Sequence, residues 1–241
     1  MKIAVAQIRP ETGNLESNLE KHLMLVEKAA INKAGLILFP ELSLTGYEPR
    51  LAEKLATHPE DPEFEELHHM SEDLEIIICA GMPVIGPKGI HISMLIFRPG
   101  KPVEEYSKQL LHPDELPFFT EGSRMIFLRK GDEKIAPAIC YESLQPDFAE
   151  GAYKGGAQIY LASVAKSSGG LEEAMPFYAS IAKKYSMTVC MSNSVGWCDD
   201  FMSAGRSSVW NPYGELVGSL GGSEEGLLVF DTLNGSLRKE T

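Results

Sequence analysis

The stretch KIAPAICYES, residues 134–143, is an apolar run that stops at Cys140 and continues directly into polar residues. We expect a buried strand up to Cys140, then a sharp turn, and then a helix in which Pro146 stands early, where proline is tolerated. Such a turn brings the cysteine out of the core, and a nearby lysine or helix N-terminus would favour its reactive thiolate. The alternative is a structural cysteine, because free cysteine is among the residue types most often buried.

The segments around this stretch alternate between strand and helix patterns. Strands are predicted over residues 2–8, 36–41, 75–84, 91–99, 102–111, 124–130, 134–140, 157–164, 187–195, 207–212 and 225–231. Helices are predicted over residues 14–35, 61–74, 146–156 and 171–186, with a capping box at Ser17 and Glu20 in the first and Asp61 as N-cap of the second. This order predicts an α/β fold with helices on the outer faces of the sheets. No linker or repeat divides the chain, so residues 1–241 are expected to form a single domain.

Composition narrows the classes of partner. The formal net charge is −12 and lysine and arginine form no cluster, which argues against nucleic acid or an anionic membrane surface. The apolar runs are shorter than the roughly 20 residues that span a bilayer, and the N-terminus lacks the pattern of a secretory signal. We therefore expect a cytoplasmic protein that acts on a small molecule. Cys79, Cys140, Cys190 and Cys198 show no C-x-x-C spacing, so neither a metal site nor a disulfide framework is expected.

Two further segments place a charged residue at or just after the end of an apolar strand. LILFPE, residues 36–41, ends in Glu41, and burial beside a thiol would raise the pKa of this carboxyl toward the range of a general base. EEYSKQLLHPDE carries Lys108 and, seven residues later, Glu115. Buried against two carboxylates, Lys108 would stay protonated and could stabilise a developing oxyanion. Each of these residues, taken alone, could equally be a solvated surface charge.

Five segments together resemble the nitrilase, or carbon–nitrogen hydrolase, superfamily. They are FPELSLTGY, YSKQLLHPDELPFFTEG, APAICYESLQPD, ASIAKKYSMTVCMSNSVG and GRSSVWNPYGELV, in the order and approximate spacing of that family. The match covers nearly the whole chain. The resemblance implies an α-β-β-α sandwich that pairs with a second copy into an αββααββα stack, and hence a homodimer or higher homo-oligomer. It implies no metal and no organic cofactor.

The resemblance also implies roles for individual residues. It makes Glu41 the general base, Lys108 the oxyanion stabiliser and Cys140 the nucleophile. Glu115 matches a second glutamate that several members place near the lysine, with Glu121 as a competing choice. The implied reaction is hydrolysis of a small-molecule amide through a thioester acyl-enzyme, which releases ammonia or an amine and a carboxylic acid.

The residues that follow the cysteine leave the branch of the superfamily open. In this sequence Tyr141 and Glu142 follow the cysteine. Nitrilases proper tend to have Trp-Glu at these two positions, and omega-amidase-like members tend to have Tyr-Asp. Tyr141 and Glu142 match locally the lipoprotein acyltransferase branch, whose membrane spans this sequence lacks. An amide bond is therefore favoured, and hydrolysis of a nitrile or an N-carbamoyl group is the alternative within the superfamily.

Substrate-binding candidates follow the predicted strand ends. Tyr47, Tyr141 and Ala165 could contact the substrate, although aromatic residues at such places also pack the mouth of a core. Arg206 could bind a substrate carboxylate, or it could be a solvated loop residue.

Two rival hypotheses come from other classes of protein. A Cys/His hydrolase would take its base from among His22, His58, His68, His69, His91 and His112. None of the six follows a strand in the way that Glu41 does. His22, His68 and His69 are expected on solvent-facing helix surfaces. The second rival is a non-catalytic binding module on the same fold.

Overall fold

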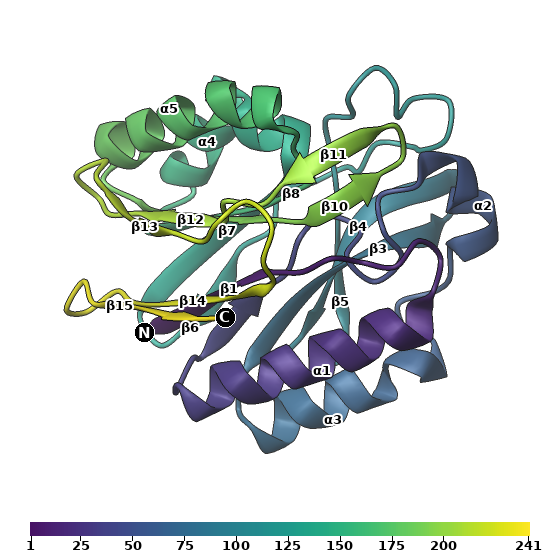
Figure 1. The fold of residues 1–241 in the computed structure, drawn as a ribbon, viewed down its shortest axis with the longest axis horizontal. Coiled ribbons are helices and arrows are strands. Elements are labelled where there is room, and N and C mark those ends of the chain that lie inside the picture. Colours follow the sequence, from purple (N-terminus) through teal and green to yellow (C-terminus); the bar gives the residue numbers. More distant parts are fainter.

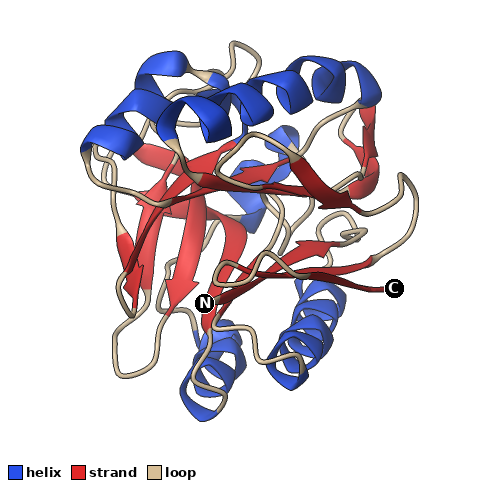
Figure 2. Ribbon diagram, turned by 90° about the vertical axis from the view of Figure 1, so that its left-hand side faces the viewer, coloured by secondary structure: helices blue, strands red, loops and turns tan.

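The computed structural model describes all residues from 1 to 241. Two β-sheets lie face to face, and helices cover the outer face of each sheet (Figure 1). Figure 2, turned by 90°, shows the same order of layers: helix, sheet, sheet, helix. The structure therefore confirms the predicted α-β-β-α sandwich.

The first sheet has seven strands in the order β15-β14-β1-β2-β3-β4-β5. In chain order these strands are β1 (Lys2–Gln7), β2 (Leu36–Leu38), β3 (Ile77–Gly86), β4 (Gly89–Phe97), β5 (Glu104–Ser107), β14 (Gly226–Asp231) and β15 (Leu237–Glu240). Strands β1, β2 and β3 are parallel, and the remaining pairs are antiparallel. Helices α1 (Leu15–Ile31) and α3 (Glu65–Asp73) lie on the outer face of this sheet, and the short helix α2 (Ala52–Leu55) lies at one end of the molecule (Figure 1).

The second sheet has six strands in the order β13-β12-β9-β8-β7-β6. In chain order these strands are β6 (Leu128–Lys130), β7 (Glu133–Ile139), β8 (Ile159–Val164), β9 (Thr188–Asn193), β12 (Ser208–Trp210) and β13 (Leu216–Ser219). Strands β7, β8 and β9 are parallel, so their carboxyl ends meet at one edge of the sheet. Helices α4 (Pro146–Lys154) and α5 (Ser168–Tyr185) cover its outer face, and β10 (Val195–Cys198) and β11 (Phe201–Ala204) form a separate hairpin (Figure 1).

The alternation of side chains along each strand builds two cores. Ile3 and Val5 of β1 pack in the core between the two sheets, whereas Ala4 and Ala6 pack against α1 and α3. Strands β2 and β3 follow the same alternation. Because both faces of these strands are covered, their sequences are almost continuously apolar, as is typical of parallel strands.

The helix starts were predicted with mixed success. The N-cap of α1 is Asn14, whose side chain accepts a hydrogen bond from the backbone N–H of Ser17 at 3.2 Å. The predicted capping box at Ser17 and Glu20 is therefore wrong, because the helix begins three residues earlier than such a box requires. Asp61 is confirmed as an N-cap, and it caps the single 3-10 turn Pro62–Phe64 that precedes α3.

Several strands differ from the prediction. The predicted strands 102–111 and 124–130 are shorter, because β5 ends at Ser107 and β6 begins at Leu128. The segment between them is irregular and carries two of the candidate catalytic residues. Strands β13 and β15 were not predicted, because they are edge strands with few buried side chains and therefore lack the apolar alternation of central strands. No helix in the chain is both long enough and apolar enough to cross a membrane.

Candidate active site

Cys140 lies directly after β7, at the start of the short 3-10 helix Cys140–Leu144, and α4 follows. Its φ angle of 45° is in the left-handed region that residues other than glycine rarely adopt. Strained backbone of this kind is common where a sharp turn presents a functional side chain. The predicted strand, turn and helix around the cysteine are therefore confirmed.

Lys108, directly after β5, lies between two carboxylates. Its Nζ donates hydrogen bonds to Oε1 of Glu41 at 2.8 Å and to Oε1 of Glu115 at 2.7 Å. The three side chains are 0 to 1% exposed, so these ion pairs are shielded from water. Glu41 follows β2 and Lys108 follows β5, so residues after the carboxyl ends of two strands of the first sheet form this charge cluster.

Further hydrogen bonds fix the position of Glu115. Its Oε1 also accepts from the Tyr47 hydroxyl at 2.9 Å, and its Oε2 accepts from the backbone N–H of His112 at 2.7 Å. Glu121 is exposed and forms no ion pair with Lys108. The structure therefore brings Glu115, and not Glu121, to the lysine.

Burial and charge set the protonation of this cluster. Burial raises the pKa of Glu41 above its ordinary value, the charge of Lys108 opposes this shift, and the charge of Glu115 adds to it. Burial alone would lower the pKa of Lys108, but the charges of Glu41 and Glu115 raise it by a larger amount, so the side chain is an ammonium ion. Oε2 of Glu41 is buried and has no hydrogen-bond partner, which leaves one carboxylate oxygen free to accept a proton.

The thiol of Cys140 is protonated at rest. Burial, followed by the negative charge of Glu41, raises its pKa to about 11, although Lys166 and Lys108 act in the opposite direction. Two lysines favour the thiolate, as the sequence suggested, but burial and the charge of Glu41 outweigh them. The sulfur needs a base at the moment of attack, and Glu41 is close enough to influence its pKa.

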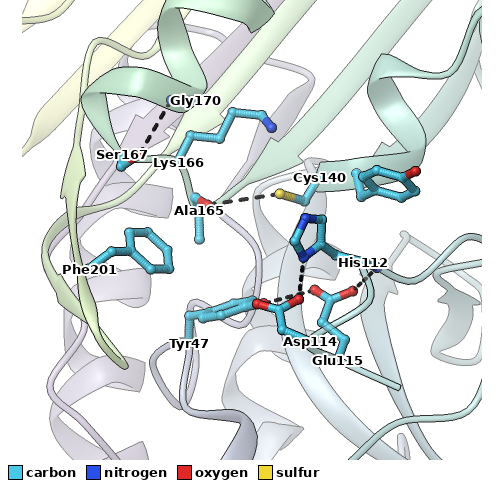
Figure 3. Close-up of a pocket in the computed structure, with 11 residues that line it drawn as sticks. Tyr47, His112, Asp114, Glu115, Cys140, Ala165, Lys166, Ser167, Gly170 and Phe201 are labelled. Atoms are coloured by element: carbon cyan, nitrogen blue, oxygen red, sulfur yellow. Dashed lines mark hydrogen bonds and ion pairs between the residues drawn. The ribbon is translucent and has the colours of Figure 1, made fainter. Parts of the chain in front are cut away.

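A cavity of about 320 Å³ opens onto Cys140 (Figure 3). This volume is at the lower end of the range for small-molecule sites. All three predicted substrate-binding residues, Tyr47, Tyr141 and Ala165, line this cavity, and so does Glu115. Sγ of Cys140 lies 3.9 Å from the carbonyl oxygen of Ala165. Arg206 is exposed and does not line the cavity.

Glu142 is a buried residue of the site that sequence reasoning missed. Its Oε1 accepts from the Tyr106 hydroxyl at 2.6 Å and from the backbone N–H of Ile139 at 2.8 Å. Its Oε2 accepts from the backbone N–H groups of Gln109 at 2.6 Å and Leu110 at 3.3 Å. One carboxylate thus joins the turn after β7 to the segment after β5. Burial raises the pKa of Glu142 to about 7, and the hydrogen bonds that it accepts limit the shift.

Two histidines lie in places that the sequence did not predict. His112 lines the cavity, where its ring pairs with Asp114 and packs edge-on against Tyr141 at 5.4 Å between centroids. His22 is fully buried, whereas a solvent-facing position was expected. Its Nε2 lies 2.9 Å from Oγ of Ser43, two residues after Glu41, so it supports the segment that carries this glutamate.

The remaining histidines, His58, His68, His69 and His91, lie outside the cavity. No group of three or more histidine, cysteine, aspartate or glutamate side chains in the chain is arranged to hold a metal ion. The ionisable side chains that line the cavity are those of Cys140, Glu115, Asp114, His112, Lys166 and the tyrosines, and Glu41 and Lys108 lie buried beside Cys140.

The sequence and the fold of this chain were compared with those of known proteins. Residues 2–237 match the family model described as Carbon-nitrogen hydrolase. Among curated relatives, the glutamine-dependent NAD(+) synthetase of Aquifex aeolicus is 26% identical over 95% of this chain, and the match covers 41% of that protein. The chain therefore spans about two fifths of the length of this relative.

Solved structures agree with this assignment. The amidase NitN from Nesterenkonia sp. AN1 has a TM-score of 0.87 at 26% identity, covering 96% of this chain and 92% of the amidase. A cysteine-to-alanine variant of the amidase from the same organism, in complex with butyramide, has a TM-score of 0.86 at 25% identity, covering 95% of this chain and 89% of that one. The chain belongs to the carbon–nitrogen hydrolase family of the nitrilase superfamily, enzymes that act on C–N bonds other than peptide bonds.

Proposed function

We propose that this protein hydrolyses the amide bond of a small molecule, with Cys140 as nucleophile, Glu41 as general base and Lys108 as oxyanion stabiliser. The observation that carries the proposal is the buried ammonium of Lys108, which is bonded to two carboxylates beside the cysteine. Burying such a charge cluster costs stability, so its presence beside the cysteine that lines the cavity supports a functional role.

In the first half of the reaction, Oε2 of Glu41 accepts the thiol proton while the sulfur of Cys140 attacks the amide carbonyl carbon. An ammonium group has three N–H donors, and Lys108 uses two of them on Glu41 and Glu115. The third can hydrogen-bond the carbonyl oxygen as it becomes negative, together with the backbone N–H of Tyr141. The C–N bond then breaks, the nitrogen takes the proton from Glu41, and ammonia or an amine leaves.

In the second half, water hydrolyses the thioester on Cys140. Glu41 takes a proton from the water as its oxygen attacks the acyl carbon, and that proton passes to the departing sulfur. The balance is one amide and one water consumed for one carboxylic acid and one ammonia or amine released. The two-step route is reasonable because an amide is a poor electrophile for unactivated water, whereas a thioester is much easier to hydrolyse.

The relatives support an amide as the bond that is broken. The Nesterenkonia variant holds butyramide, a short aliphatic amide, and the Aquifex relative depends on glutamine, whose side chain ends in an amide. A cavity of about 320 Å³ suits molecules of this size.

A panel of substrates tests the proposal. The parent protein and Cys140→Ala are incubated with short aliphatic amides, ω-amides, N-carbamoyl compounds and nitriles, and ammonia release is followed. We expect release from one or more amides by the parent alone. Release only from nitriles or only from N-carbamoyl compounds would assign the alternative reaction, and binding without any release would indicate a non-catalytic module.

The base is tested separately, because His112 also lines the cavity. Its ring pairs with Asp114, and its side chain is 53% exposed, whereas Glu41 is fully buried beside the thiol. We expect Glu41→Gln to lose turnover and His112→Asn to keep most of it. The opposite pattern would indicate a Cys/His mechanism.

A further inference from the structure

The main chain of Lys166, two residues after the end of β8, is held by four hydrogen bonds. Its N–H donates to Oδ1 of Asn193 at 2.8 Å. Its carbonyl oxygen accepts from Nδ2 of Asn193 at 3.1 Å, from the N–H of Ala204 at 2.9 Å and from the hydroxyl of Ser203 at 3.2 Å. Asn193 and Ser203 are themselves buried, so the position from which this side chain starts is fixed.

The ammonium group of Lys166 has no protein partner. No carboxylate lies within 4 Å of its Nζ, and the side chain neither donates nor accepts a hydrogen bond. Lys166 lines the same cavity as Cys140, and Figure 3 shows its side chain on the side of the cavity where the sulfur lies. Its positive charge is also among the causes that lower the pKa of Cys140. An unpaired cation in a concave site of a protein with net charge −12 attracts an anion to that place.

The surroundings of Lys166 leave room for such an anion. Ser167 and Gly170, at the start of α5, line the cavity beside it, and the first turn of this helix carries no acidic side chain. The acidic residues of the cavity already have partners, because Glu115 pairs with Lys108 and Asp114 pairs with His112. Lys166 is thus the one lysine or arginine that lines the cavity, and it forms no ion pair with a carboxylate of the protein.

We propose that Lys166 binds an anionic group of the substrate, so that the preferred substrate is a small amide whose other end carries a carboxylate. This inference rests on the proposed function and specifies its substrate class. An ammonium that meets a carboxylate in a partly desolvated cavity forms a charge-assisted hydrogen bond, which neutral aliphatic amides cannot offer. Neutral amides should therefore be poorer substrates of this protein.

Alkylation of Cys140 tests the inference without any need for turnover. Iodoacetate carries a carboxylate where iodoacetamide carries a neutral amide. The rate at which each reagent labels Cys140 is measured by peptide mass spectrometry. The ratio of the iodoacetate rate to the iodoacetamide rate is compared with that of N-acetylcysteine in the same buffer. A change in the thiol pKa alters both rates by the same factor, so the ratio reports only on recognition of the anion.

We expect the ratio for the parent to exceed that of N-acetylcysteine by at least about tenfold. Lys166→Met should bring the ratio down to that of the free thiol, and Lys166→Arg should keep most of the preference. Lys101→Met removes the same charge from an exposed turn and should leave the ratio unchanged. A parent ratio at or below that of the free thiol, an unchanged ratio in Lys166→Met, or no labelling of Cys140 by either reagent would overturn the inference.

Turnover supplies a second readout. Succinamate and butyramide have the same four-carbon chain and differ in a terminal carboxylate against a methyl group. Lys166→Met should lower kcat/KM for succinamate by at least about tenfold and change that for butyramide by less than about twofold. Equal effects on both amides would overturn the carboxylate role. If no amide of the wider panel releases ammonia, the proposed function fails, and the alkylation ratio still decides whether Lys166 binds an anion.

Discussion

Lys108 holds two carboxylates in the interior, so its charge serves both stability and the proposed chemistry. Lys108→Ala should leave Glu41 and Glu115 buried without a cation, which typically costs about 3–5 kcal/mol. It should also lower kcat/KM by about 10²–10³-fold or more, because the developing oxyanion loses its main donor. Urea unfolding and steady-state kinetics measure the two effects, with Lys101→Ala as an exposed control. A folded Lys108→Ala variant that keeps kcat/KM within tenfold of the parent would contradict the assigned role.

Glu41→Gln separates two effects of the same carboxylate. Burial raises the pKa of Cys140 most, and the negative charge of Glu41 raises it further, to about 11. Removing that charge should lower the thiol pKa, so the alkylation of Cys140 by iodoacetamide should reach its plateau at a lower pH than in the parent. Turnover should nevertheless fall by about 10²-fold or more, because no base remains to take the proton. A variant with a lower thiol pKa and undiminished turnover would exclude Glu41 as the base.

At the scale of elements, Glu142 connects the turn after β7 to the segment after β5. Glu142→Gln replaces one acceptor oxygen with an NH₂ group, which cannot accept the hydrogen bonds that Gln109 or Tyr106 now donates. We expect kcat to fall at least about tenfold with little change in KM, and stability to fall by about 1–3 kcal/mol. Glu150→Gln, on the exposed surface of α4, is the matched control. A Glu142→Gln variant with parental kcat would show that Glu142 does not position the site.

His22 couples the packing of α1 to pH. Burial lowers its pKa to about 4, whereas the unfolded chain has the ordinary value of 6.5. The unfolded state therefore binds a proton in this window and the folded state does not, so the contribution is complete above pH 6.5 and is lost as pH falls toward 4. The loss at pH 4.5 is on the order of 2 to 3 kcal/mol.

Urea unfolding of the parent and of His22→Gln at pH 7 and pH 4.5 measures this contribution. We expect the stability of the parent to fall more steeply with acid than that of the variant. His69→Gln, at an exposed position of α3, should behave like the parent. Parallel pH dependence in the parent and in His22→Gln would show that His22 is not buried in its neutral form.

Some residues of the site could be predicted from the sequence and others could not, for physical reasons. Glu41 and Cys140 could be predicted because each one interrupts a continuously apolar strand at its end. Glu142 and Lys166 could not, because their roles depend on which loops meet above the edge of the sheet, and no local pattern encodes that meeting. His22 was misplaced because its polarity suggested solvent, whereas its ring packs on Phe39 at 4.0 Å between centroids.

At the scale of the whole molecule, the site lies where the two sheets meet. Glu41 and Lys108 come from strand ends of the first sheet, and Cys140 and Lys166 come from the second. Hydrogen bonds join the sheets near this end, as when Ser163 of β8 donates to the carbonyl oxygen of Phe39 at 2.8 Å. The catalytic geometry therefore depends on the packing of the whole sandwich.

The outer layer over the second sheet exposes aromatic side chains. Tyr153 of α4 is 51% exposed and stacks on Tyr185 of α5, and Tyr213 is 76% exposed next to Gly214, which approaches Ala179 of α5. Exposed aromatic residues of this kind favour an interface. We expect two copies to pair through this layer into the αββααββα stack.

Sedimentation equilibrium tests the pairing. The parent should have a mass of about 53 kDa, twice the 26.5 kDa of one chain. Tyr213→Glu should shift the protein toward the monomer, and Leu233→Glu, at an exposed turn between β14 and β15, should not. A parent that sediments as a monomer at micromolar concentrations would contradict the expected dimer.

Detection of the covalent intermediate tests most directly whether Cys140 is the nucleophile. The parent is mixed with an amide that releases ammonia, quenched with acid within milliseconds to seconds, and examined by mass spectrometry. We expect a transient mass increase equal to the acyl group less one hydrogen, located on the peptide that contains Cys140 and absent from Cys140→Ala. Ammonia release by Cys140→Ala, or turnover by the parent without any acyl group on this cysteine, would show that Cys140 is not the nucleophile.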